Sequence, residues 1–257
     1  VELTLQVLRT VRGVPGVREG RRYIRLVVTR GLGDLGIHPA KVCGGTVFAI
    51  AAEIQLYPEE LYERGIELSV ARQVRRPGAD VLDPSIKSSN YLNNIRALLE
   101  SLGEGRPETL MLTREGFIAE ATADNLFLVR RLTGWEDDPS RVTVSTPVTR
   151  YCLGGITRGL ILAAARRRGY RIEEVGDMVV EDLTGADREV FLTGTGAGLI
   201  PVIAVGRNAV GDGVPGPVTR QLRSSLLAAM ADPDMGLPIA ATEVDVAAYL
   251  ASGDLAR

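Results

Sequence analysis

The chain has 257 residues, of which 45% are hydrophobic and 24% are charged, and its formal net charge is −2. These values are typical of a folded protein with one large domain or two modest ones, and they exclude a disordered chain. The near-neutral charge argues against nucleic acid as a partner. No apolar run approaches the roughly 20 residues that cross a bilayer, so we expect no membrane partner.

Hydrophobic periodicity and turn residues predict the elements in chain order. We expect helices at residues 3–12, 59–64, 90–102, 157–168, 218–230 and 243–250. Strands are expected at residues 22–29, 46–51, 66–70, 109–113, 117–120, 125–129, 141–144, 189–193 and 199–205. The third helix is amphipathic, with Leu92, Ile95, Leu98 and Leu99 on one apolar stripe.

The order of these elements predicts the domain organisation. Strands outnumber helices in the middle of the chain, which indicates two mixed α/β or α+β domains and not a simple doubly wound sheet. We expect a small N-terminal domain at residues 1–55, a polar linker at 56–64 and a large domain at 65–257. The chain starts at Val1 with helical spacing and no signal-peptide pattern, so we expect it to begin partway into a domain.

A glycine-rich segment follows the first strand, where residues 31–36 match the G-x-G-x-x-G pattern of dinucleotide sites. That site requires a helix to begin at once, so that its first N–H groups face the pyrophosphate. Here Pro39 follows closely and opposes a helix. We therefore interpret the glycines as places of close backbone approach and expect no nicotinamide cofactor.

Residue counts restrict the chemistry further. The single histidine, His38, rules out a zinc site built from several histidines, and we expect no metal. Two cysteines are too few for a disulfide framework, so we expect a reducing, cytoplasmic location. Among 30 basic residues only Lys41 and Lys87 are lysines, and either could be a chance survivor or a required primary amine.

Lys87 is the first of a group of residues that together could bind one cofactor. Tyr91 follows it by four residues, and Glu120 comes at the end of a short strand. The segment 154–157 opens a helix, and the small-residue loop 193–198 follows a strand, so both can bind an anion through N–H groups. Each residue alone has an ordinary structural explanation. Together they supply the amine, phenol, carboxylate and phosphate sites that pyridoxal 5'-phosphate (PLP) needs.

At this point the chain resembles the fold-type IV PLP enzymes, and among them the branched-chain-amino-acid aminotransferases. The matching strings are YIRLVVTRGLGDLGIHP, IKSSNYLNN, GFIAEATADNLFLV, GGITRGLI and FLTGTGAGLIPV, in family order over about residues 1–230. The resemblance implies a two-domain fold-type IV architecture. Nothing matches the family's N-terminal strands or phosphate-binding arginine, so we expect an incomplete small domain.

The resemblance also implies a role for each matching residue. Lys87 is similar to the Schiff-base lysine, which also moves the proton at the substrate carbon, while Tyr91 resembles the tyrosine at the ring oxygen and Glu120 the glutamate at the ring nitrogen. Ile156, Thr157 and Thr195 resemble the phosphate-binding residues. Tyr23 and Arg25 stand where the family orients substrate carboxylates, and Thr195 with the Gly196 amide resembles the turn that holds the α-carboxylate.

The reaction that the resemblance implies is transfer of an amino group from L-leucine, L-isoleucine or L-valine to 2-oxoglutarate, in a homodimer or higher homo-oligomer. Three alternatives stay open: D-amino-acid aminotransferase, aminodeoxychorismate lyase, and a truncated family member with impaired catalysis. The D-specific enzymes are expected to carry an Arg-x-His pair soon after the Thr-Arg-Gly, whereas here Gly31 to Asp34 follow Arg30. This difference favours the branched-chain substrates.

Overall fold

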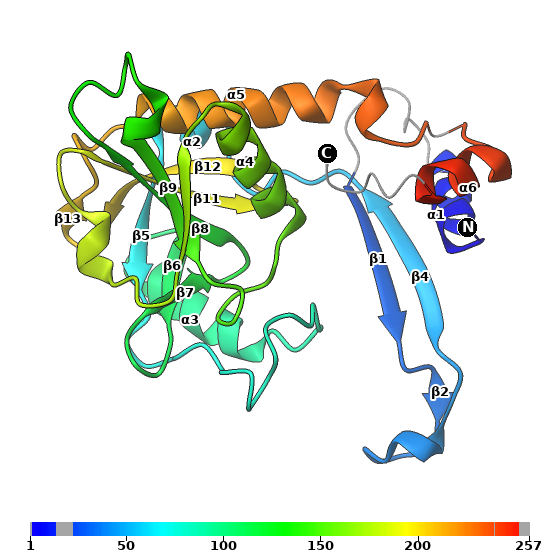
Figure 1. Ribbon diagram of the computed structural model, residues 1–257. Coiled ribbons are helices and arrows are strands. Elements are labelled where there is room, and N and C mark those ends of the chain that lie inside the picture. Colours follow the sequence, from blue (N-terminus) through cyan, green and yellow to red (C-terminus); the bar gives the residue numbers. More distant parts are fainter. Residues whose placement is uncertain (1, 14–22, 239, 252–257) are drawn as a thin grey trace. The chain divides into compact units, whose positions relative to one another are not determined.

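The structure, a computed structural model, describes residues 2–13, 23–238 and 240–251 (Figure 1). The described residues form two compact units, one from residues up to 55 together with those from 232 onward, and the other from 56–231. This division differs from the expected one at two places. The segment 56–64 belongs to the large unit instead of a linker, and the segment from 232 onward groups with the small unit, while residues 252–257 lie outside the description.

The small unit has a helical part in which α1 and α6 meet. Helix α1 (Glu2–Arg12) buries one face, and that face packs against helix α6 (Glu243–Ala251). The shared core consists of Leu5, Leu8, Ala241 and Val246. An amphipathic helix such as α1 must cover its apolar stripe, and the C-terminal segment supplies the cover. A short 3-10 turn, η5 (Pro233–Met235), precedes α6.

The remainder of the small unit is a pair of antiparallel ribbons. Strand β1 (Tyr23–Thr29) pairs with β4 (Thr46–Ala52), and β2 (Leu32–Gly33) pairs with β3 (Val42–Cys43) across the 3-10 turn η2 (Pro39–Lys41). Arg22, expected in the first strand, lies outside the described residues. A Cβ at Gly33 would lie 2.1 Å from the Lys41 carbonyl oxygen. Gly31 and Gly33 therefore serve close backbone approach, as predicted, and no α-helix begins directly after the glycine-rich segment.

The large unit is built on one mixed sheet. Within the described residues nine strands join in the order β10-β9-β8-β11-β12-β5-β6-β7, with β13 paired to β12. The pairs β10–β9, β12–β5 and β5–β6 are parallel, and the others are antiparallel. The bounds are β5 Ile66–Val70, β6 Glu108–Leu112, β7 Ile118–Ala121, β8 Asn125–Arg131, β9 Val142–Pro147, β10 Arg171–Val175, β11 Arg188–Gly194, β12 Gly198–Val205 and β13 Asn208–Ala209.

Helices cover both faces of this sheet. Along β8 the side chains alternate, so Phe127 and Val129 enter one core while Leu126 and Leu128 enter the other. Helices α4 (Ile156–Arg167) and α5 (Pro217–Ala231) pack on the first face, and α2 (Glu59–Arg64) packs on the second. Two further 3-10 turns are η3 (Pro139–Arg141) and η4 (Val180–Leu183). No helix in the described part of the chain is long and apolar enough to span a membrane.

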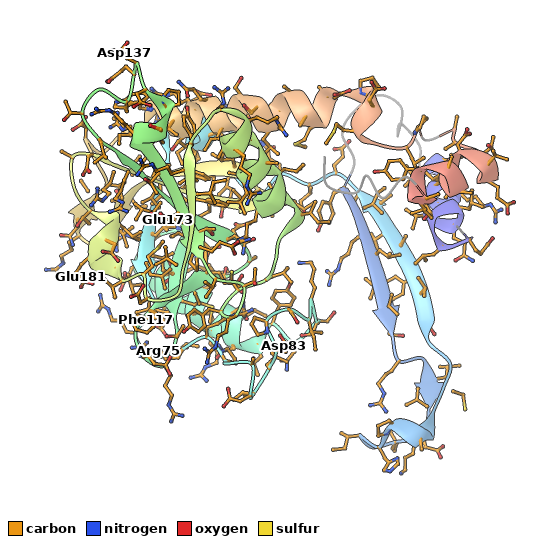
Figure 2. The ribbon with its side chains drawn as sticks, in the orientation of Figure 1. Arg75, Asp83, Phe117, Asp137, Glu173 and Glu181 are labelled. Atoms are coloured by element: carbon orange, nitrogen blue, oxygen red, sulfur yellow. The ribbon has the colours of Figure 1, made fainter. Side chains whose placement is uncertain are left out.

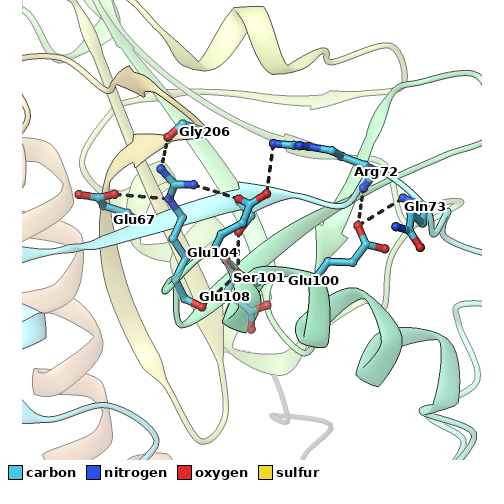
Figure 3. Close-up of polar contacts among 10 residues, drawn as sticks. Glu67, Arg72, Gln73, Glu100, Ser101, Glu104, Glu108 and Gly206 are labelled. Carbon is cyan, nitrogen blue, oxygen red and sulfur yellow. Dashed lines mark hydrogen bonds and ion pairs between the residues drawn. The ribbon is translucent and has the colours of Figure 1, made fainter.

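Helix α3 (Leu92–Gly103) packs with a largely polar face and not with its apolar stripe. Its leucine-rich stripe is exposed, with Leu92 at 68% and Leu99 at 62%, whereas Asn94 and Ser101 are buried. Buried polar side chains need hydrogen-bond partners within the protein. Ser101 has one, since its Oγ donates to the Glu108 carbonyl at 2.8 Å. Figure 3 shows this junction, in which the Glu100 carboxylate also accepts from the backbone N–H groups of residues 72 and 73.

Candidate active site

A cavity of about 240 Å³ opens in the large unit, where four loop segments meet. Its walls come from the segment between β5 and α3, the end of β7 with the loop after it, the loop before α4, and the end of β11. The sequence-predicted residues Lys87, Tyr91, Glu120, Ile156, Thr157 and Thr195 all line this cavity. The fold therefore gathers onto one surface six residues that are spread over 109 positions of the chain, from 87 to 195.

Lys87 is the lysine of this cavity. It lies in the loop that leads into α3, and Tyr91 takes the N-cap position of that helix. The other lysine, Lys41, belongs to the small unit, where its Nζ donates to the Leu35 carbonyl at 3.0 Å. The cavity thus brings a primary amine and a phenol together, as the spacing of Lys87 and Tyr91 predicted.

Glu120 is a buried carboxyl with a strong cationic partner. It sits on β7, and its Oε1 lies 2.6 Å from Arg76 Nη2 while its Oε2 accepts from the Leu153 N–H at 3.2 Å. Burial raises the pKa of Glu120 to about 7, whereas Arg76, the Leu153 N–H and Lys87 act to lower it. Sequence reasoning missed Arg76, because nothing in the run Arg75-Arg76 separates a buried arginine from an exposed one.

The loop before α4 forms a cup that could hold an anion. Gly155 is the N-cap of α4 and offers no side chain to the first N–H groups, which remain available to a ligand. A hydrogen bond from β8 fixes this loop, because Asn125 Nδ2 donates to the Leu153 carbonyl at 2.8 Å. Asn125 belongs to a segment that the sequence singled out, but this role became visible only in the structure.

The turn between β11 and β12 forms another wall. Thr193, Gly194 and Thr195 line the cavity, and Gly196 follows in the turn without lining it. The Thr193 hydroxyl is buried and has no hydrogen-bond partner among the described residues. A buried, unpaired hydroxyl on a cavity wall is suited to a polar ligand. Tyr62 Oη on α2 donates to the Ala197 carbonyl at 2.9 Å and so holds the turn.

Other ionisable groups surround the cavity. Burial, Glu108 and Glu120 raise the pKa of Asp124 to about 7. Glu108 accepts from the backbone N–H and the hydroxyl of Thr122, at 3.1 and 2.8 Å, and so fixes the strand end that follows Glu120. Burial raises the pKa of the Cys152 thiol to about 12, so this thiol stays protonated at neutral pH. The described residues contain no cluster of three or more side chains that could hold a metal ion.

The two expected substrate residues of the first strand lie in the small unit. Tyr23 and Arg25 occupy alternate positions of β1, so their side chains share one face of the ribbon. Tyr23 is half-buried and Arg25 is exposed. Their assignment to the substrate stays a prediction.

Comparison with known proteins identifies the family. The model of the family described as amino-transferase class IV matches residues 6–205, which is more than half of the chain. The chain belongs to the class IV aminotransferases. Its cofactor is accordingly PLP, and the resemblance to fold-type IV enzymes is confirmed.

Several members of class IV can be compared directly. A Methanocaldococcus jannaschii protein, provisionally named branched-chain-amino-acid aminotransferase, is 37% identical over 84% of this chain and 69% of its own length. The D-alanine aminotransferase of Bacillus licheniformis is 30% identical over 66% of this chain and 54% of its own length. Among solved structures, the branched-chain amino acid aminotransferase of Escherichia coli has a TM-score of 0.77, with 28% identity over 88% of this chain and 70% of that chain.

The cavity of this class IV chain fits its cofactor. The uncapped start of α4 and the unpaired Thr193 hydroxyl offer donors to a phosphate, and Glu120 offers an acceptor to a protonated ring nitrogen. Glycine at position 155 keeps the cup open, because a Cβ there would lie 2.3 Å from Asn125 Oδ1. These donors and this acceptor are the groups that PLP requires from a protein.

Proposed function

We propose that this chain transfers amino groups from the branched-chain L-amino acids leucine, isoleucine and valine to 2-oxoglutarate. The observation that carries the proposal is that Lys87 lines one cavity with Glu120, Tyr91 and the start of α4. The similarity to branched-chain aminotransferases in sequence and structure supports the choice of substrates.

In this proposal each side chain around the cofactor has its own role. PLP, when bound, supplies a ring that accepts electrons from the reacting carbon. The Lys87 amine would hold the cofactor covalently, and as a free amine it would carry the proton to and from that carbon as general base and acid. Glu120 holds the proton of the ring nitrogen, and Tyr91 donates to the ring oxygen. The N–H groups of Ile156 and Thr157 hold the phosphate, together with Thr195.

Substrate binding is assigned to two places. Thr195 and the Gly196 amide hold the α-carboxylate, which both substrates carry. Tyr23 and Arg25 are assigned to the substrate side chain, because the Arg25 guanidinium can bind the second carboxylate of 2-oxoglutarate. One site then serves both half-reactions, so the kinetics are ping-pong.

We also propose that the chain acts as a homodimer or higher homo-oligomer in the cytoplasm. Helix α3 exposes an apolar stripe of Leu92, Ile95, Leu99 and Leu102, a kind of surface that monomers seldom leave open. The two cysteines, Cys43 and Cys152, are free, which supports a reducing compartment.

Single-turnover absorbance of the PLP-loaded chain tests the function. We expect L-leucine to convert the bound cofactor and 2-oxoglutarate to restore it. Lys87→Ala should remove both steps, whereas Lys41→Ala should leave them unchanged. Borohydride reduction followed by peptide mapping should place the trapped cofactor on Lys87.

The same measurement decides against the alternatives. Conversion by D-alanine but not by L-leucine would support the second candidate, a D-amino-acid aminotransferase, which the similarity to the Bacillus licheniformis enzyme favours. A trapped cofactor on Lys87 without conversion by either amino acid would identify a chain with impaired catalysis or a lyase. Trapping on Lys41 would contradict the site assignment itself.

A further inference from the structure

Glu120 is already paired before any ligand reaches the cavity. The ion pair with Arg76 is buried on both sides, with the arginine side chain 13% exposed and the glutamate side chain 7% exposed. Its length of 2.6 Å between Nη2 and Oε1 is that of a charge-assisted hydrogen bond. The second oxygen, Oε2, accepts from the Leu153 N–H. The carboxyl is thus held from two sides and has little freedom to turn.

Arg76 is itself fixed by its neighbours. Its backbone N–H donates to the Leu112 carbonyl of β6 at 2.8 Å, and its Nη1 lies 3.4 Å from Asn94 Oδ1 on α3. Asn94 in turn donates to the Thr122 carbonyl at 2.6 Å, at the end of the strand that carries Glu120. The guanidinium is therefore positioned by β6, α3 and the loop after β7, and its orientation does not depend on a ligand.

The charges around Glu120 give Arg76 a specific effect. Glu120 is faced by Arg76 and Lys87, which favour its charged form, and lies near Asp124 and Cys152. The Lys87 amine gains and loses protons and bonds as it takes part in the proposed reaction, but an arginine keeps its charge at every working pH. Arg76 is therefore the cation that can oppose the burial of Glu120 throughout a reaction cycle.

We propose that Arg76 is a positioning residue for the transamination, which favours the charged form of the Glu120 carboxyl and aims this carboxyl at the ring nitrogen of PLP. The inference rests on the proposed function, because it assumes that Glu120 meets that nitrogen. A carboxylate can hold the proton of the ring nitrogen, whereas a neutral carboxylic acid cannot. Arg76 thus acts on the electron-accepting strength of the cofactor through Glu120.

The test compares Arg76→Met, Arg76→Lys and a matched control, Arg75→Met. Arg75 is exposed, and Figure 2 shows it pointing away from the large unit; its Nη1 donates to the carbonyls of residues 71, 72 and 74. The first readout is the titration of Glu120 in the full chain without cofactor, followed by carboxyl carbon NMR. We expect the midpoint to rise by roughly one to three pH units in Arg76→Met. It should return most of the way in Arg76→Lys and stay unchanged in Arg75→Met.

The second readout is the pH profile of the L-leucine half-reaction in the PLP-loaded chain. Arg76→Met should lose roughly ten- to a hundredfold in rate at pH 6 and recover as the pH rises, because Glu120 then ionises without help. In a Glu120→Gln background, Arg76→Met should have no further effect on this profile.

Two results would overturn the proposal. An unchanged Glu120 midpoint in both Arg76 variants would show that the arginine does not set the ionisation. A loss of equal size in the Glu120→Gln background would show that Arg76 acts by another route. If Arg76→Met does not fold, Arg76→Gln, which is also uncharged but keeps a polar end, replaces it in both readouts. The NMR titration needs no turnover. Its result therefore tests the effect of Arg76 on Glu120 even if the proposed function is wrong.

Discussion

Gly155 lacks a side chain because Asn125 occupies the place where a Cβ would stand. That Cβ would lie 2.3 Å from Asn125 Oδ1, and Asn125 cannot move without losing its bond to the Leu153 carbonyl. We predict that Gly155→Ala displaces the cup before α4 and costs about 1–3 kcal/mol of cofactor binding, or roughly ten- to a hundredfold in the Kd for PLP. Spectroscopic titration of the cofactor-free chain with PLP measures this loss.

Gly154→Ala is the matched control for that experiment. A Cβ at Gly154 meets Thr149 Cγ2 at 3.7 Å, which is ordinary van der Waals contact. We expect this variant to bind PLP nearly as tightly as the parent chain. An equal loss in both variants would show that the contact with Asn125 is not the cause.

At this scale the sequence reveals the groups that do chemistry but not the groups that support them. Lys87 stands out because lysine is rare in the chain, and the glycines mark the cup before α4. Arg76 and Asn94 carry no such signal, because their importance comes from burial beside Glu120 and Thr122, which lie 44 and 28 positions away. Contacts at such separations depend on the register of β6 and β7, which a single sequence does not reveal.

Among the elements, helix α5 is capped at its N-terminus by a buried carboxylate. Glu189 of β11 is 3% exposed, accepts from the N–H groups of Val218 and Thr219 at 3.2 and 2.7 Å, and lies 3.1 Å from Arg131 Nε. Glu189→Gln keeps the shape but loses the charge and turns an amide NH₂ toward these donors. We predict a loss of roughly 1.5–3 kcal/mol in the free energy of unfolding, measured by urea denaturation.

Glu173→Gln serves as the comparison for this loss. Glu173 pairs with Arg130 at 3.4 Å, but both side chains are about half exposed, at 47% and 45%. Its removal should cost less than about 1 kcal/mol. A similar loss in the two variants would mean that the start of α5 gains little from Glu189.

The elements themselves follow the sequence closely where periodicity is strong. Helix α2 and strand β5 have the predicted bounds, and α5 extends one residue beyond them at each end. Strand β10 was not predicted, because Arg171–Val175 is a largely polar edge strand without the expected alternation. The sequence shows the apolar stripe of α3 but not that this stripe is exposed, because the hydrogen bonds of the buried Asn94 and Ser101 are made with residues outside the helix.

For the whole molecule, the predicted division of the chain differs most at the C-terminal segment. A single sequence shows that α1 and α6 each have an apolar face, but it does not show that these faces meet across more than 200 residues. By contrast, the α/β class and the fold-type IV architecture could be predicted, because the cofactor motifs occur in a fixed order along the large unit.

The buried carboxyls of the large unit should make the stability of the cofactor-free chain depend on pH. Burial raises the pKa of both Asp124 and Glu120 to about 7, while exposed carboxyls in an unfolded chain titrate near ~4. Between these values the folded chain holds protons that the unfolded chain has lost. This contribution to stability is therefore fully present below pH ~4 and is lost as the pH rises through about 7.

We predict that the free energy of unfolding falls as the pH rises from about 5 to 8, by at most ~1.4 kcal/mol per pH unit for each such proton. Urea unfolding followed by the fluorescence of the single tryptophan, Trp135, reports on the large unit. Asp124→Asn removes one of the two titrating carboxyls and should therefore flatten the pH dependence. The charged groups that act on Asp124 are Glu108, Glu120 and Lys87. Asp137→Asn is the control, because Asp137 is exposed at the outer edge of the large unit (Figure 2). Stability that rises with pH in this range, or an equal slope in Asp124→Asn and the parent chain, would show that these carboxyls are already ionised in the folded state.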